Sequence, residues 1–342
     1  MFFRCRFIIA EKINLFFPIF LTIISHIKGQ ELFIHAEPAS SLPKGVIGLS
    51  LSDQLYREVD QSRNLFATKV LYGITSHWSI ACILSFSNHH GTSWPVDFID
   101  HLQNSSGSIF SVKKIKRGIK YPYLMNGIYF YSKYRIYSLD NRNRHFRIAL
   151  FGEASYINVP HDEAEPSLMD DTRGVGGGVI MTFLNKHFAS SWTLGGIYPF
   201  SFSKDNPALH QFIDPAIITL KSAPAIQSSL SFGYLLYPRV YKNFRQTNWN
   251  LYLELIFKSY GRAKVLLNDQ PVFSQSIFLS PSSYLEVHPG IQHIINSNLR
   301  LDFSVGWKWA GGSYVRYYPI ISFGISRYFY PSIKKTKFNN AS

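Results

Sequence analysis

The chain has 342 residues, of which 46% are hydrophobic and 16% aromatic, while only 16% are charged. Soluble domains carry about a quarter charged residues, so this balance is typical of a membrane protein built from strands. The net charge of +14 comes from basic residues scattered singly, apart from those at 113–120 and in the tail, and this scatter argues against nucleic acid as a partner. The two cysteines provide no disulfide framework, because Cys5 falls in the N-terminal leader and leaves Cys82 alone.

The first 29 residues have the pattern of a signal peptide. Arg4, Arg6 and Lys12 precede a mostly apolar run at 13–24 that is short for a membrane helix. We expect cleavage near residue 29, followed by a periplasmic segment at 30–44; an uncleaved signal anchor is the alternative. No later stretch reaches the roughly 18 apolar residues of a spanning helix, so a membrane domain here must be a closed barrel.

Alternation of apolar and polar residues with period two dominates the chain from Gly45 onward and predicts strands with two different faces. In the segment 78–86, Trp78, Ile80 and Leu84 fall on one face, and small residues occupy the other except at Ile83. The segments 249–258 and 299–308 repeat this pattern. Each apolar face suits lipid, and each polar face suits water.

Twelve such strands are expected, at residues 45–56, 67–75, 77–88, 125–138, 145–156, 174–184, 188–199, 225–236, 247–259, 282–295, 298–309 and 316–329. Their lengths are close to the 9 to 11 residues, roughly, that a tilted strand needs to cross a membrane. Short turns at 76, 140–144, 185–187, 237–246 and 296–297 broadly alternate with longer connections at 57–66, 89–124, 157–173, 200–224, 260–281 and 310–315. We therefore predict an all-β protein, a transmembrane antiparallel up-and-down β-barrel of about 12 strands over residues 45–329, with both termini periplasmic and a C-terminal tail at 330–342.

Tryptophan placement supports the same fold, because indoles prefer the membrane interface. Trp78, Trp192 and Trp249 follow short turns, whereas Trp307 and Trp309 approach an outer connection. This spacing predicts two aromatic girdles. A soluble periplasmic β-sandwich is the alternative fold, but it would hide its aromatic face.

Three stretches resemble a known group of proteins. They read AEPASSLPKGVIGLSL at 36–51, KYRIYSLD at 133–140 and HFRIALFGEAS at 145–155. They look like parts of uncharacterised outer-membrane barrels of the Bacteroidota, sometimes labelled transporter-like. The resemblance implies a Gram-negative outer-membrane protein, with membrane lipid and the barrel-assembly machinery as partners. Phe329 closes the last expected strand with an aromatic residue, as barrel-assembly signals do.

Alternation assigns eleven charged side chains to the inward face of the barrel. These are Lys133, Arg135, Arg147, Glu153, Glu254, Lys258, Glu286, His288, Arg300, Asp302 and Lys308. Mixed charges on a lumen wall either pair to fill a narrow barrel or line a water-filled path that selects solutes by charge.

Two expected outer loops hold residue types that bind metals. One contains His89, His90, Asp97, Asp100 and His101, and the other contains His161, Asp162, Glu163, Glu165, Asp170 and Asp171. Their spacing matches neither a closed zinc site nor a calcium loop, so we favour solvated loop residues and expect no metal or cofactor. The glycines at 174 and 176–178 indicate a barrel corner, because the lysine and hydroxyl of a phosphate loop are missing.

One strand offers residue types for hydrolysis. Ser282, Glu286 and His288 share a face of the expected strand, with Ser283 beside them, but no nucleophile elbow surrounds them. We therefore expect no enzyme, and predict a passive or weakly selective channel or transporter for a small or apolar solute. The alternatives are a non-enzymatic surface barrel with a plugged lumen and partner-binding loops, and an outer-membrane hydrolase.

Overall fold

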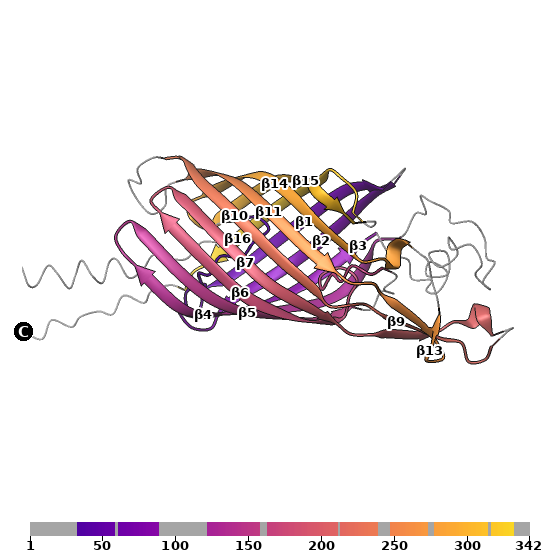
Figure 1. Ribbon diagram of the computed structural model, residues 1–342. Helices are drawn as coiled ribbons and strands as arrows, with labels where there is room; N and C mark the ends of the chain where they lie inside the picture. The colour runs from indigo at the N-terminus through magenta and orange to yellow at the C-terminus, as the bar shows by residue number, and fades with distance from the viewer. Residues whose placement is uncertain are drawn as a thin grey trace, which may run out of the picture.

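Twelve strands form a closed barrel in the computed structural model, which describes residues 33–58, 61–88, 122–157, 163–210, 213–238, 247–272, 277–313 and 316–331 (Figure 1). The barrel strands are β1 Ile47–Glu58, β2 Gln61–Gly73, β3 Trp78–Ser87, β4 Leu124–Asp140, β5 Arg144–Ile157, β6 Gly174–Asn185, β7 Phe188–Pro199, β10 Ala225–Tyr237, β11 Asn248–Tyr260, β14 Ser282–Ile295, β15 Leu299–Gly312 and β16 Ile320–Phe329. The expected signal peptide at 1–29 and most of the expected tail lie outside the described residues. No helix among the described residues is long and apolar enough to cross a membrane.

The first and last strands close the barrel. They pair antiparallel from Ile47 opposite Phe329 to Leu55 opposite Ile321. Every other barrel strand pairs antiparallel with the strands before and after it in the barrel, so each barrel strand has two neighbours. The predicted fold, an up-and-down barrel of twelve strands, is confirmed.

The outer surface of the barrel is apolar, and strand β11 illustrates how alternation produces it. Leu251 and Leu253 are 43% and 40% exposed, whereas Tyr252 and Glu254, which alternate with them, are buried. Large apolar side chains on eleven of the twelve barrel strands are exposed in the same way, and Leu285, Val287 and Ile291 of β14 are partly exposed. Because such a surface is unfavourable in water and suits lipid, this face is the membrane-contacting face.

At one end of the barrel, which we call the inner end, four of the five connections between strands have only two to four residues. Asn296 and Ser297 join β14 to β15 with φ values of 51° and 59°. Two consecutive positive φ values are typical of the hairpin turns whose twist matches that of the flanking strands. The chain also enters β1 and leaves β16 at this end (Figure 1), the end that faces the periplasm in barrels of this kind.

The connection between β1 and β2 is shorter than predicted. The sequence predicts a long outer loop at 57–66, but the ladder continues to Glu58 opposite Gln61. This prediction was wrong because residues 61–64, Gln-Ser-Arg-Asn, are polar and do not alternate. Strand pairing continues beyond the lipid, where water contacts both faces and alternation is not required.

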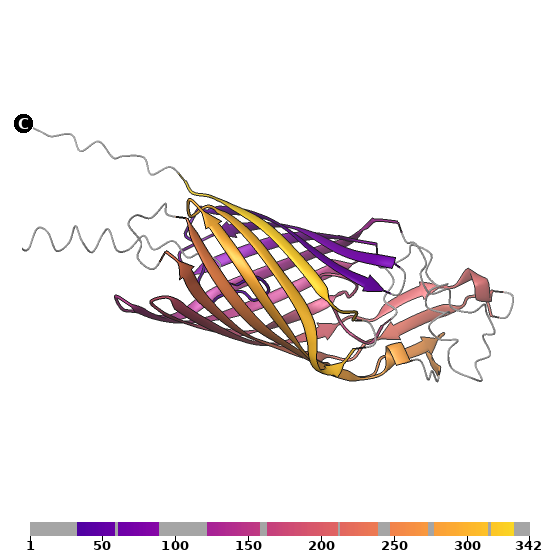
Figure 2. The ribbon, with the colours of Figure 1, turned by 90° about the horizontal axis from the view of Figure 1, so that it is seen from above.

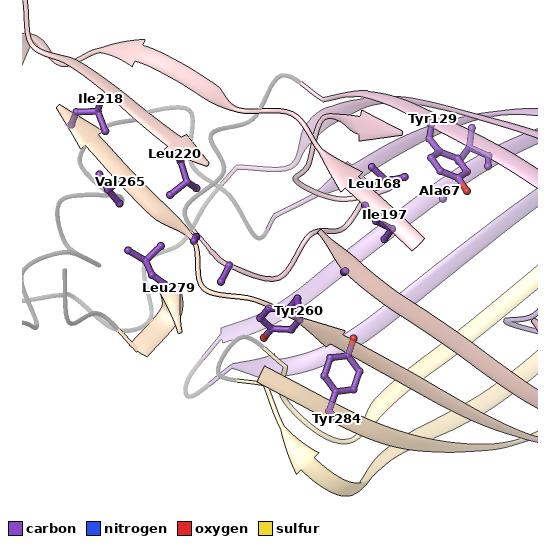
Figure 3. Close-up of a cluster of buried hydrophobic side chains, with 14 of the residues drawn as sticks. Ala67, Tyr129, Leu168, Ile197, Ile218, Leu220, Tyr260, Val265, Leu279 and Tyr284 are labelled. Atoms are coloured by element: carbon purple, nitrogen blue, oxygen red, sulfur yellow. The ribbon is translucent and has the colours of Figure 1, made fainter. Parts of the chain in front are cut away.

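A second, four-stranded sheet extends from the opposite, outer end (Figures 1 and 2). It consists of β8 Phe202–Asp205, β9 Ile217–Lys221, β12 Lys264–Leu267 and β13 Gln270–Val272, in the order β13-β12-β9-β8. Its strands lie within the two connections predicted as loops at 200–224 and 260–281. Ile218, Leu220, Val265 and Leu279 form a buried cluster that continues to Tyr260 and Tyr284 on the barrel rim (Figure 3). We call this element the outer sheet.

Candidate functional site in the barrel lumen

The N-terminal segment lies inside the barrel. Residues 33–44, which we call the lumenal segment, form hydrogen bonds with inward-facing residues of β2, β4, β6 and β11. Phe33 is 1% exposed and packs edge-on against Tyr252, with 5.8 Å between the ring centroids. The expectation of a periplasmic segment at 30–44 therefore differs from the structure for the described residues. Two prolines and several small residues give this segment no periodic pattern from which its position could be predicted.

A single buried carboxylate binds the first part of the lumenal segment. The Oε1 atom of Glu254 accepts hydrogen bonds from the backbone N–H groups of Ile34 and His35 at 3.0 and 2.9 Å. Its Oε2 atom accepts from the N–H of Ala36 at 2.9 Å and from the hydroxyl of Ser231 at 3.0 Å. Consecutive N–H groups that converge in this way form an anion-binding concavity. Here the barrel wall supplies the anion.

Two lysines of the wall bind the next acidic residue, Glu37. Lys133 of β4 donates to Oε2 of Glu37 at 3.0 Å and to the carbonyl oxygen of Pro38 at 2.7 Å, while Lys69 of β2 pairs with Oε1. Burial of the Glu37 carboxyl opposes its ionisation, but the two ammonium groups outweigh burial and hold its pKa well below the ordinary value. The lumenal segment and the wall thus neutralise each other's charges.

Hydrogen bonds continue along the lumenal segment toward the inner end. The N–H of Ala39 donates to the Thr182 hydroxyl at 2.8 Å, and Arg147 donates to the Ser40 hydroxyl at 2.8 Å. The Ser41 hydroxyl donates to the carbonyl oxygen of His77, also at 2.8 Å. The segment is therefore bound to the wall by polar contacts over most of its length.

A second polar cluster fills the outer half of the lumen and involves the connection between β5 and β6. Glu165 accepts hydrogen bonds from Lys258 at 3.2 Å, Tyr284 at 2.7 Å, Ser313 at 2.8 Å and Arg316 at 3.1 Å. Burial of the Glu165 carboxyl opposes its ionisation, but Arg316 and then Lys258 outweigh burial and lower its pKa to about 2.

The acidic loop therefore faces inward where we expected solvated residues. Glu163, Glu165 and Asp171 are 6%, 3% and 4% exposed. His161 and Asp162 lie outside the described residues, as do the histidines and aspartates at 89–101. Among the residues that the structure describes, no group of three or more histidine, cysteine, aspartate or glutamate side chains is arranged to hold a metal ion.

A cavity of about 250 Å³ separates the lumenal segment from this outer cluster. It is lined by His35 of the segment, by Glu165, Asp170 and Arg316 of the outer connections, and by His288 of the wall. The His35 and His288 rings lie 4.6 Å apart, and burial together with His288 lowers the pKa of His35 to about 3, so His35 is uncharged at neutral pH. The cavity has a mixed lining, in which these charged groups lie beside apolar residues such as Leu65, Met169 and Ile256.

The structure places the eleven residues that alternation assigned to the lumen as follows. Lys133, Glu254, Lys258, Glu286, His288, Arg300 and Asp302 are buried inside the barrel, and Arg147 and Glu153 are partly buried and bonded to inward groups. Arg135 donates to the Ser76 carbonyl oxygen next to a bulge in β4, and Lys308 is exposed where it lies opposite Glu286. Sequence reasoning missed Glu37, because the lumenal segment has no strand pattern. It also did not single out Lys69 and Arg316, although both fall within expected strands, at 67–75 and 316–329.

The hydrolytic candidates have other partners. His288 pairs with Glu286 at 3.0 Å between Nε2 and Oε2. Ser282 donates to the carbonyl oxygen of Gly312, and Ser283 bonds to Ser259 at 2.7 Å. The contacts of these serines hold strands together and do not connect them to His288.

A closed antiparallel barrel with an apolar outer surface, a polar interior and mostly tight turns at one end is typical of one class of membrane protein. The chain is an outer-membrane β-barrel protein.

Comparison with known proteins agrees at the level of fold. No family model and no curated protein sequence matches the chain. The structure of the COG4313 outer membrane channel from Pseudomonas putida F1 matches with a TM-score of 0.55 at 9% identity, covering 87% of this chain and 100% of that chain. The NanC porin matches with a TM-score of 0.43 at 9% identity, covering 83% of this chain and 100% of that chain. The structure of outer membrane phospholipase A from Escherichia coli matches with a TM-score of 0.31 at 9% identity, covering 87% of this chain and 94% of that chain. At these identities the likeness to the first of these structures concerns the fold alone.

Proposed function

We propose that this protein is a gated, non-enzymatic outer-membrane channel for small polar solutes, and that the lumenal segment closes it. The observation that carries the proposal is the way the segment is bound. Noncovalent hydrogen bonds and ion pairs to Glu254, Lys69, Lys133 and Thr182 connect it to a polar wall. Water can replace such contacts, so the segment can leave and return.

The inward face supports passage of polar solutes in particular. The buried inward groups of β11, β14 and β15 are mostly polar, although three tyrosines and one isoleucine are among them. The polar ones are Asn248, Glu254, Lys258, Glu286, His288, Gln292, Arg300, Asp302 and Ser304. Once water fills the lumen, these groups offer hydrogen-bond partners to a polar solute along its path. The resemblance of residues 36–51 to transporter-like barrels of the Bacteroidota supports the same class.

A swelling assay in proteoliposomes tests this proposal. Purified protein with and without residues 33–42 is refolded, and the heat-modifiable band of a folded barrel is verified for both on a gel. We expect liposomes with the shortened protein to swell in isosmotic arabinose or glycine several times faster than those with the full chain. If a correctly folded shortened barrel is as tight as lipid alone, the channel proposal is wrong.

The outer sheet favours a second function, which is binding of a partner by a barrel that never opens. The outer sheet projects beyond the barrel and contributes to a buried core (Figures 2 and 3). This alternative predicts no swelling in either sample, together with surface binding that is lost when residues 202–221 are replaced by a short linker.

A further inference from the structure

We propose that Lys69 and Lys133 form a carboxylate-binding site of the channel, and that Glu37 occupies it in the closed state as a substitute for a solute. When the lumenal segment moves aside, the carboxylate of a small organic acid takes the place of Glu37. The inference rests on the proposed gating, because the site becomes accessible only when the segment leaves.

The geometry is that of a two-point carboxylate clamp. Lys69 comes from β2 and Lys133 from β4, two strands separated in the barrel by β3. Each ammonium group contacts a different oxygen of the Glu37 carboxylate, Lys69 at Oε1 and Lys133 at Oε2. A free carboxylate has the same two oxygens in the same arrangement, so it can make both contacts.

The contacts of Lys133 favour replacement of Glu37 by the carboxylate of a solute. It is 4% exposed, and both of its hydrogen bonds, to Glu37 and to the carbonyl oxygen of Pro38, go to the lumenal segment. Departure of the segment removes both partners of this ammonium group, and water or another anion must then take their place. A carboxylate solute therefore stabilises the open state by binding to it.

The surroundings of the clamp indicate which acids fit. A cavity of about 20 Å³ adjoins Glu37 and Lys133, and the wall side of this cavity is formed by Leu71, Ala81 and Tyr131, together with Ser79. When the segment leaves, the space of its side chains is added to this cavity. A carboxylate with a short apolar body suits this site, because the body contacts the apolar side chains while the charge contacts the lysines.

Hydrogen exchange of the lumenal segment tests the inference without requiring conduction. Mass spectrometry follows the peptide containing residues 33–44 in the refolded full-length barrel, in sodium butyrate and in sodium chloride of equal ionic strength. We expect butyrate at about ten times its dissociation constant to increase exchange roughly tenfold, since a ligand of the open state shifts the equilibrium by that factor. Lys133→Gln should abolish the difference between butyrate and chloride.

Lys258→Gln is the matched control. Lys258 is equally buried in the wall at 7% exposure but pairs with Glu165, outside the lumenal segment. This variant should keep the butyrate response. Equal exchange in butyrate and chloride, or a full response in Lys133→Gln, would overturn the carboxylate site.

The two proposals fail in different ways. If the shortened protein conducts arabinose but butyrate leaves exchange of the full chain unchanged, the carboxylate site is wrong and the channel stands. If butyrate increases exchange but no sample conducts, the channel is wrong and the clamp is a ligand site of a closed barrel.

Discussion

Replacing Glu254 by glutamine should open the barrel. The carboxylate of Glu254 is fully buried, and it accepts three backbone hydrogen bonds from Ile34, His35 and Ala36. Glutamine has nearly the same size but keeps a single acceptor oxygen. Its NH2 group takes the place of the second carboxylate oxygen. This group is a donor, but it faces either backbone N–H groups or the Ser231 hydroxyl, which now donate to Glu254.

The size of the effect follows from these contacts. Hydrogen bonds to a charged acceptor contribute about 1.5 to 3 kcal/mol each, and a buried donor left without a partner costs about 1 to 3 kcal/mol. Glutamine loses one or two of these bonds, but it also removes the cost of burying a charge, so we expect a net weakening of about 2 to 4 kcal/mol. At 1.4 kcal/mol for each factor of ten, the open population rises by roughly 30- to 700-fold.

Single-channel recording in planar bilayers measures this population as the open probability. Glu153→Gln is the control, because Glu153 is also an inward carboxylate but bonds to Tyr129 and Gln227 in the wall. We expect Glu254→Gln to open frequently and Glu153→Gln to behave like the wild type. Equal open probabilities in these two folded variants would refute the role of Glu254 in holding the segment.

Three further predictions concern other parts of the molecule. A disulfide between Ala39→Cys and Thr182→Cys should hold the segment in place, so that swelling occurs only after reduction. The pKa of Glu165 is about 2, against 4.5 for the free side chain, so its stabilisation is complete above pH 4.5 and is lost as the pH falls through 2. The melting temperature should therefore fall over this range, and less steeply in Glu165→Gln. Leu253→Arg places a charge on the lipid-facing surface and should destabilise the folded barrel by about 2 to 4 kcal/mol in denaturant titrations, whereas Leu253→Phe should not.

The barrel strands could be predicted closely because their pattern is local. Strand β11 was expected at 247–259 and is Asn248–Tyr260, and β7 agrees at both ends. Lipid on one face and polar groups on the other impose alternation on every spanning strand. The outer sheet was missed because it lies beyond the lipid. In β9, Ile218, Thr219 and Leu220 are consecutive buried residues, and their burial removes the period-two signal.

For the candidate site, the sequence predicted the residues of the barrel wall but not those of the lumenal segment. Alternation placed Lys133 and Glu254 on the inward face, and the structure buries both. It did not identify their partners, Glu37 and the backbone of residues 34–36, which are 96 and up to 220 positions away. An irregular segment that crosses a lumen contacts many strands once each, so its position has no repeating signature in the sequence.

The contacts of the lumenal segment also indicate where opening begins. Phe33 packs with Ala189 and Tyr252 in an apolar cluster, and full burial of such a side chain contributes about 1.5 to 3 kcal/mol. At the other end, Val46 is buried and the N–H of Gly45 donates to the carbonyl oxygen of Gly73. The part between these anchors, around Glu37, has charge-assisted contacts of about 1.5 to 3 kcal/mol each, which another anion can replace in kind. A carboxylate solute that reaches the clamp lysines makes the same kind of contact that Glu37 gives up, so it favours displacement of the segment at this position.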